Sequence, residues 1–277
     1  MEAIDIFFAR ILAALAISIF CLVGTACHAK KPPAPQYVNV APLPGSGLAL
    51  DSEGKPDGQG AMQINIPVAY TPGSDFASIS AYAGQFARRD KSHPDWANGT
   101  GTLAFGFGKW PRVYGSAMAV SSLIWTDSKV LSGQMQVVKE TERSPAIAIG
   151  AQDILNKEQN DFGATRNTGV SYYAVATKTF RISDHKVYGT LGYGAARFLD
   201  RPFVGLSAPI NNQVSFATEY DGYQINAAVG WRPWGRYSPA TLLAGWNGRC
   251  GALAGAQVTG KVSGWWAIPA MCLLIRH

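Results

Sequence analysis

Residues 223–232 read YQINAAVGWR, and apolar residues alternate in this stretch with small or polar ones. One face would carry Tyr223, Ile225, Ala227, Val229 and Trp231, and the other Gln224, Asn226, Ala228, Gly230 and Arg232. A period of two residues is that of a β-strand, whose successive side chains point to opposite faces of the sheet. The stretch therefore predicts a strand with an apolar environment on one side and a polar one on the other.

Similar segments follow one another along the chain and are separated by turn-forming residues. Twelve candidate strands are 62–70, 76–86, 102–110, 112–125, 131–138, 145–153, 170–180, 186–197, 201–210, 213–220, 223–232 and 241–246. Residues 251–262 form a thirteenth candidate, so either a terminal segment pairs as well or one of the twelve is not a strand. The short connections exclude βαβ crossovers and predict an antiparallel sheet.

The composition is that of a strand-rich chain. Of its 277 residues, 47% are hydrophobic and 15% are charged, against about 25% charged in ordinary soluble domains. Thirty glycines and an aromatic share of 11% favour tight turns and many strands. The net charge is +6, but the basic residues are scattered rather than clustered, which argues against a nucleic-acid partner.

The N-terminus has the features of an export signal. Residues 11–23 are apolar, which is too short for a bilayer span of about 20 residues but suits a signal-peptide core. We therefore expect a cleaved signal peptide over 1–29 and a Pro/Gly-rich segment over 30–59. A β-barrel domain over 60–262 and an atypical tail or last strand over 263–277 would follow.

Alternation alone does not separate a soluble β-sandwich, whose apolar faces meet inside, from an outer-membrane barrel, whose apolar face meets lipid. Three features favour an antiparallel up-and-down transmembrane β-barrel of about 12 strands (12–14). The polar faces are rich in Gln, Asn, Ser, Thr and Gly, and segment lengths approach the ~9–11 residues of a membrane-spanning strand. Aromatic residues recur near segment ends: Tyr70, Trp110, Trp125, Phe180, Trp231, Trp234 and Trp246. A soluble periplasmic β-sandwich that binds a ligand is the alternative.

In the barrel interpretation, the polar faces supply the candidate site. The candidate lumen-facing residues are Gln63, Asn65, Gln134, Gln136, Glu219, Gln224, Asn226 and Arg232. They would either line a path for a polar solute or fill a narrow interior with hydrogen-bonded side chains, as in a small barrel. The sequence leaves both interpretations open.

No combination of residues indicates catalysis. Glu219 and Asp221 are a carboxylate pair, but Asp221-Gly222 predicts a tight hairpin turn, and Glu219 is expected in the lumen beside a base such as Arg232. His93 and His185 would be the only candidate bases of a lipid-modifying barrel enzyme, and both are expected to be solvated loop residues.

Metal binding and disulfide bonding are weakly indicated. Asp153, Glu158 and Asp161 do not have the spacing of a known calcium loop. Cys250 and Cys272 are the cysteines of the mature chain, and the sequence leaves their pairing open. We therefore expect a non-enzymatic protein with no catalytic residues, no metal and no cofactor.

Several stretches resemble YjbH-like bacterial outer-membrane proteins, which are linked to exopolysaccharide production. They are GSGLALDSEGKPDGQG (45–60), SPAIAIGAQDI (144–154), YYAVATKTF (172–180) and the run 201–233 with its Glu219-Tyr220-Asp221-Gly222 hairpin. The resemblance implies a barrel in the outer membrane of a Gram-negative bacterium, with a role in polysaccharide export or surface assembly and no catalytic residues. The expected partners are outer-membrane lipid and a polysaccharide or other polar solute.

Overall fold

The computed structural model describes residues 40–84, 99–120, 129–155, 169–248 and 251–261, which belong to one compact unit, residues 34–277. Predictions about the following lie outside the described residues: the signal peptide 1–29, residues 30–39, the tail 263–277, His93, Trp125, Glu158, Asp161, Cys250 and Cys272. Among the described residues, no helix is long and apolar enough to cross a membrane.

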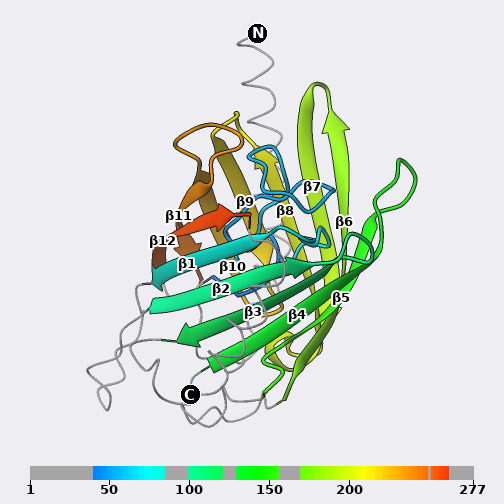
Figure 1. Ribbon diagram of the computed structural model, residues 1–277, viewed down its shortest axis with the longest axis vertical. Coiled ribbons are helices and arrows are strands. Elements are labelled where there is room, and N and C mark those ends of the chain that lie inside the picture. Colours follow the sequence, from blue (N-terminus) through cyan, green and yellow to red (C-terminus); the bar gives the residue numbers. More distant parts are fainter. Residues whose placement is uncertain (1–39, 85–98, 121–128, 156–168, 249–250, 262–277) are drawn as a thin grey trace. The chain divides into compact units, whose positions relative to one another are not determined.

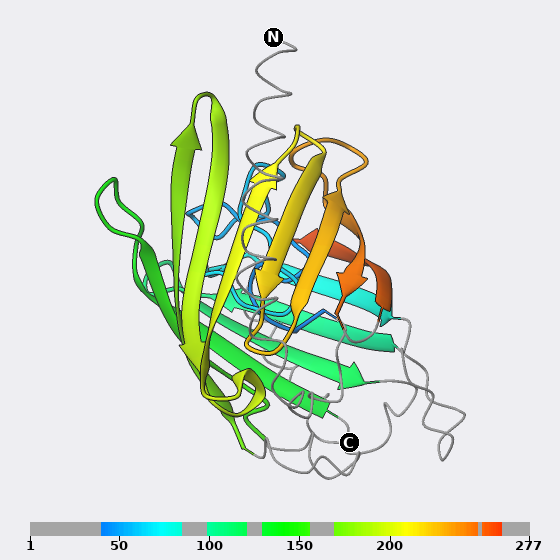
Figure 2. The same ribbon diagram turned by 180° about the vertical axis from the view of Figure 1, so that it is seen from behind.

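Twelve strands form a closed barrel, in which each strand pairs antiparallel with its sequence neighbours and β1 closes the ring with β12 (Figures 1 and 2). The strands are β1 (Ala77–Gly84), β2 (Gly99–Phe107), β3 (Val113–Val120), β4 (Lys129–Val138), β5 (Ala146–Gln152), β6 (Ser171–Ile182), β7 (His185–Gly194), β8 (Arg201–Pro209), β9 (Val214–Tyr220), β10 (Ile225–Trp231), β11 (Ala240–Asn247) and β12 (Gly251–Gly260). A 3-10 helix, η1 (Ala196–Phe198), lies between β7 and β8. The predicted antiparallel up-and-down barrel of about 12 strands is confirmed.

The outer surface of the barrel carries apolar side chains, as the alternation in 223–232 predicts. In β10, Val229 and Trp231 are 39% and 46% exposed, whereas Asn226 is fully buried. Other exposed apolar side chains of the wall are Ile79, Val113, Ile149, Leu191, Leu242 and Val258, and aromatic ones near strand ends are Trp110, Tyr172, Phe180, Tyr193 and Trp246. Because every strand is paired on both sides, the wall has no open sheet edge, as a barrel in lipid requires.

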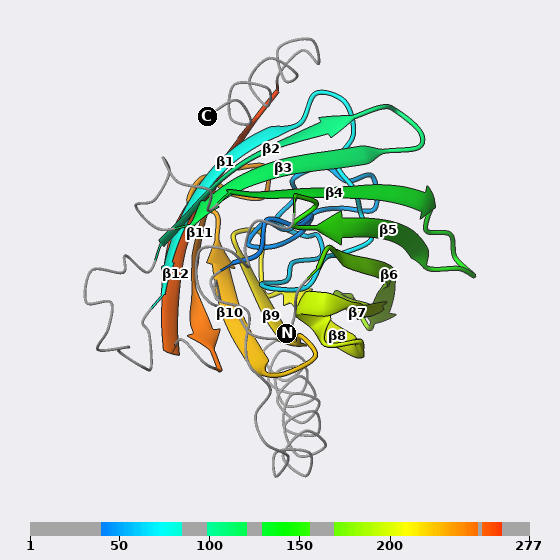
Figure 3. The ribbon, with the colours of Figure 1, turned by 90° about the horizontal axis from the view of Figure 1, so that it is seen from below.

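Residues 40–76 precede β1 and lie inside the barrel, and we call them the interior segment (Figure 3). The stretch 62–70, predicted as the first strand, belongs to this segment and is not a strand. It makes isolated bridges, such as the one between Ser46 and Gln63. The strand that completes the ring is instead β12, the thirteenth candidate.

Burial on both faces explains why this first strand was wrongly predicted. The apolar Met62 and Ile64 are fully buried, and so are the polar Gln63 and Asn65 between and beside them. An alternation that separates lipid from lumen in the wall therefore separates nothing here, because both faces of the stretch lie inside the barrel.

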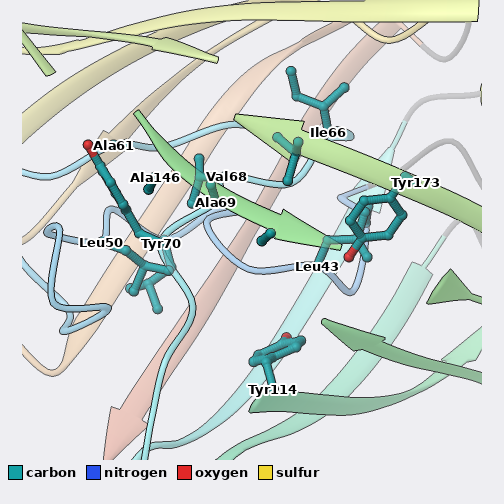
Figure 4. Close-up of a cluster of buried hydrophobic side chains, with 14 of the residues drawn as sticks. Leu43, Leu50, Ala61, Ile66, Val68, Ala69, Tyr70, Tyr114, Ala146 and Tyr173 are labelled. Carbon is teal, nitrogen blue, oxygen red and sulfur yellow. The ribbon is translucent and has the colours of Figure 1, made fainter. Parts of the chain in front are cut away.

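The hydrophobic core lies inside the wall, between the wall and the interior segment. Leu43, Ile66 and Val68 of the interior segment share a buried cluster with Tyr114 of β3 and Tyr173 of β6 (Figure 4). The sequence left open whether the polar faces line a path for a solute or fill a narrow interior. The described interior is filled by the chain's own apolar and polar side chains.

The two ends of the barrel differ in their connections. Five connections lie at what we call the turn end: 108–112, 139–145, 183–184, 210–213 and 232–239. The opposite end, which we call the loop end, includes the longest connection, residues 153–170 between β5 and β6. Both the start of β1 and the end of β12 lie at the turn end.

Candidate functional site

The candidate site is the set of contacts between the interior segment and the inner face of the wall. Glu219 of β9 accepts hydrogen bonds from the backbone N–H groups of Ile64, at 2.8 Å, and Asn65, at 2.6 Å. The Nδ2 atom of Asn226 on β10 donates to the same carboxylate at 3.0 Å. Glu219 is 1% exposed. This wall carboxylate therefore binds the backbone of the interior segment directly.

The β9–β10 turn holds a polar network beside Glu219. Asp221 accepts hydrogen bonds from the Asn226 side chain at 2.9 Å and from the backbone N–H of Gln224 at 3.1 Å. The Gln224 side chain donates to Asn247 of β11 at 2.8 Å. Gly222 has a φ of 100°, which favours glycine, in the turn that the sequence predicts there. Burial raises the pKa of Asp221 above its ordinary value.

The two predicted glutamines of β4 also point at the interior segment. Gln134 donates to the Val68 carbonyl at 2.9 Å and to the Thr71 hydroxyl at 2.7 Å, and it accepts from the Tyr173 hydroxyl at 3.0 Å. Gln136 accepts from the backbone N–H of Thr71 at 3.4 Å. Their amides therefore fill the interior by hydrogen bonding to the chain itself.

Gln63 and Asn65 lie on the interior segment rather than on the wall. Both side chains are fully buried, and neither amide has a hydrogen-bond partner among the described residues. A buried polar group left without a partner costs about 1–3 kcal/mol. The cost of burying these two amides therefore offsets part of the free energy that apolar packing contributes to docking of the interior segment.

Arg232 does not lie beside Glu219, so the expected pairing of these two residues is wrong. In the β9–β10 hairpin, Glu219 pairs with Asn226 near the loop end, whereas the backbone N–H of Arg232 donates to Gln213 at the turn end. The Arg232 side chain donates to the Thr241 hydroxyl at 3.2 Å. Burial lowers the pKa of Arg232 to about 10.

A second set of contacts, which we call the clasp, holds residues 57–61 of the interior segment at the turn end. Arg236 donates from Nε and Nη2 to the two carboxylate oxygens of Asp57, each at 2.6 Å. The Gly58 N–H donates to the Arg236 carbonyl at 2.8 Å, and the Ser215 hydroxyl donates to the Gly58 carbonyl at 2.9 Å. Burial alone would raise the pKa of Asp57, but the Arg236 guanidinium outweighs it and holds that pKa below its ordinary value.

Two further ties join the interior segment to the turn end. Glu53 forms an ion pair with Arg112, which follows β2. The Tyr70 hydroxyl donates to Glu140 at 2.5 Å, and Lys178 lies 3.5 Å from the same carboxylate. Sequence reasoning missed all of these ties because their partners are distant in the chain.

The predicted absence of a metal site concerns residues that the structure describes only in part. Of the three candidate ligands only Asp153 is described, and it is 3% exposed at the loop end. His185, which was expected in a solvated loop, instead begins β7 at the turn end and is partly buried. Within the described ranges, no group of three or more His, Cys, Asp or Glu residues is arranged to hold a metal ion.

Comparisons with known proteins give a structural likeness alone. No family model matches the chain, and no curated protein matches it. The solved structure of LpxR from Salmonella typhimurium is similar, with 9% identity, a TM-score of 0.34, and coverage of 67% of this chain and 99% of that chain.

This match corrects one prediction. LpxR is an enzyme, so the match contradicts the prediction that the protein has no enzymatic activity, and that prediction is not kept. At 9% identity and a TM-score of 0.34, the match gives this chain no activity either.

Proposed function

We propose that the protein is an outer-membrane barrel that takes part in the export or surface assembly of exopolysaccharide, and that its own interior segment closes its lumen. The observation that carries the proposal is the bond from the wall to the segment: Glu219 accepts the backbone N–H groups of Ile64 and Asn65 at 2.8 and 2.6 Å. A buried carboxylate that binds main-chain donors is a strong tie, because hydrogen bonds to charged groups are stronger than neutral ones.

The polar groups on the inner face of the wall support the proposal that the solute is polar. Inward-facing wall residues that are buried against the interior include the hydroxyls of Ser116, Ser132, Thr177 and Thr190 and the amide of Gln134. Withdrawal of the interior segment would leave these neutral donors and acceptors facing the lumen. Such groups suit the hydroxyl groups of a sugar chain, which agrees with the resemblance to YjbH-like proteins.

The connections support an orientation. Barrels of the outer membrane have short periplasmic turns and longer extracellular loops. The turn end has connections such as 183–184 and 210–213, whereas the loop end has 153–170. We therefore place the turn end, with the clasp, on the periplasmic side.

Conductance in planar bilayers tests whether the segment closes the lumen. The wild-type chain is expected to give no steady conductance, whereas Glu219→Ala, which leaves the N–H groups of Ile64 and Asn65 without their acceptor, is expected to give open-channel events. Glu142→Ala, which removes an exposed glutamate at the turn end, is the matched control and should stay closed. A steady wild-type conductance would contradict a closed lumen.

Deletion of the gene tests the polysaccharide role. Exopolysaccharide released by the deletion strain is expected to fall and to recover on complementation. Loss of exopolysaccharide in the deletion strain, together with no conductance in Glu219→Ala, would exclude a conduit for export and leave the barrel as a scaffold for surface assembly. Unchanged exopolysaccharide would remove the polysaccharide role, whatever the conductance.

A further inference from the structure

Two arginines lie side by side on the β10–β11 turn, and the carboxylate that Arg236 binds comes from the interior segment rather than from the wall. Arg236 binds both oxygens of Asp57. Arg232 donates from Nη1 to the Arg236 carbonyl at 2.6 Å, so the two residues are linked through the main chain. A planar guanidinium that binds both oxygens of a carboxylate is the geometry that proteins use to recognise acidic ligands.

The β10–β11 turn holds this geometry by bonds of its own. The Gly235 N–H donates to the Arg232 carbonyl at 3.1 Å, and the Ser238 N–H donates to the Gly235 carbonyl at 3.0 Å. The backbone N–H of Arg232 donates to the Gln213 carbonyl at 2.7 Å. None of these bonds involves Asp57. The arginines would therefore stay in place if the carboxylate left.

Arg232 keeps an unused donor. Its side chain is 2% exposed, and its Nη2 atom has no hydrogen-bond partner in the part of the chain that the structure describes. Asp57 uses both of its oxygens on Arg236. A free carboxylate or phosphate group could accept from both guanidinium groups, because a carboxylate offers about four lone-pair sites.

The interior segment packs on the Arg232 side chain. Gly58 packs against the Arg232 side chain so closely that a Cβ atom on it would lie 3.2 Å from Arg232 Cδ. Departure of residues 57–61 would therefore uncover the second guanidinium. Arg236 is already reachable, since its side chain is 37% exposed, whereas that of Asp57 is 6% exposed.

The same turn presents exposed aromatic rings beside the arginines. Trp234 and Tyr237 are 72% and 73% exposed, and the Arg236 guanidinium lies 5.1 Å from the centre of the Tyr237 ring. Exposed Trp, Tyr and Arg side chains in one place are typical of binding hot spots.

We infer that Asp57 is an internal stand-in for the acidic group of a ligand, and that a ligand carboxylate replaces it on Arg236 and Arg232 and so releases residues 57–61. The ligand class is an acidic polymer, of which a uronate-bearing sugar chain is the test case. The inference rests on the proposed function, because it names the ligand chemistry and the opening step of the same lumen.

Labelling of a buried cysteine tests the release. Ala61 is fully buried, so Ala61→Cys, in a full chain whose own cysteines are replaced by serine, should react slowly with a maleimide in vesicles. A galacturonate oligosaccharide at constant ionic strength is expected to raise the labelling rate about tenfold, the effect of losing one charge-assisted pair. A maltose oligosaccharide of equal length is expected to leave the rate unchanged.

Variants of the two ion pairs separate the ligand site from the general hold on the segment. Asp57→Asn should label fast without ligand, and Arg236→Gln should label fast and lose the galacturonate response. Glu53→Gln, which breaks the other ion pair at the same end, is the matched control and should keep the response. Inorganic phosphate is expected to accelerate labelling much less than the polymer at equal charge.

Three results would overturn the inference: no acceleration by galacturonate, equal acceleration by the maltose oligosaccharide, or a full response in Arg236→Gln. These outcomes are independent of the proposed function. Conductance of Glu219→Ala and exopolysaccharide loss on deletion would still stand if the ligand response failed. Conversely, a galacturonate response with unchanged exopolysaccharide would keep the acidic-ligand site and remove the polysaccharide role.

Discussion

Residues 62–70 and residues 225–231 alternate alike in sequence, but one stretch lies inside the barrel and the other forms its wall. In β10, Val229 is 39% exposed on the outer face and Asn226 is fully buried on the inner one. In the interior segment, Ile64 and Asn65 are both fully buried although they occupy opposite phases of the pattern. Periodicity therefore shows that two faces differ in composition but not that they differ in environment.

The backbone hydrogen bonds reveal what separates the two stretches. The N–H groups of Met62, Ile64 and Ala69 donate to side chains of the wall, whereas those of β10 enter ladders with β9 and β11. Pro67 interrupts the first stretch, and proline within a run has no N–H to donate and argues against a central strand. A segment whose amides bond to side chains can leave the barrel interior without breaking the sheet.

A charge placed at the buried centre of the interior segment should have the largest effect. Ile64→Asp puts a carboxylate in a fully buried position beside the acidic Glu219, and a buried unpaired charge is among the changes that cost more than about 4 kcal/mol. We expect the interior segment to undock while the barrel persists. Limited proteolysis should cut the segment, and heat-modifiable mobility in detergent gels should be retained. Loss of that mobility would show that the segment is needed for the barrel itself.

A charge on the outer face of β10 should destabilise the barrel wall rather than the docking of the interior segment. Val229→Arg is expected to destabilise the barrel in vesicles by about 2–4 kcal/mol, the cost of arginine near the bilayer midplane. Urea unfolding in vesicles measures this. The interior segment of the variant should stay protected from protease as long as the barrel is folded. An unchanged free energy of unfolding would contradict lipid contact at Val229.

The contrast also shows how far the sequence alone could reach. The wall strands were predictable because lipid selects one face, as in β10, and twelve of the thirteen candidates are strands. Pro67 was the local signal against 62–70, the candidate that is not a strand. The tie between Asp57 and Arg236 was not predictable, because these residues are 179 positions apart and neither lies in a periodic stretch.

The clasp should respond to acid, unlike the lipid-facing wall. The folded-state pKa of Asp57 lies below its ordinary value of 3.8, so its ion pair stabilises docking above pH 3.8 and is lost as the pH falls through the lowered pKa. The labelling rate at Ala61→Cys is divided by that of a free thiol at the same pH, because maleimides react with the thiolate. This ratio should rise below about pH 3.8. Asp57→Asn should remove that acid-induced rise. A rise centred near pH 6 would point to a different group.

The smallest effect, opposite in sign, is expected at Gln63. Its side-chain amide is fully buried and has no hydrogen-bond partner among the described residues, so the docked segment carries the cost of desolvating it. Gln63→Leu has a similar volume and should strengthen docking by about 1 kcal/mol. The equivalent change in the wall, Gln134→Leu, removes an amide that binds Val68, Thr71 and Tyr173, and should weaken docking. Slower labelling at Ala61→Cys in the first variant and faster labelling in the second would show that a buried amide strengthens docking only when the chain satisfies it.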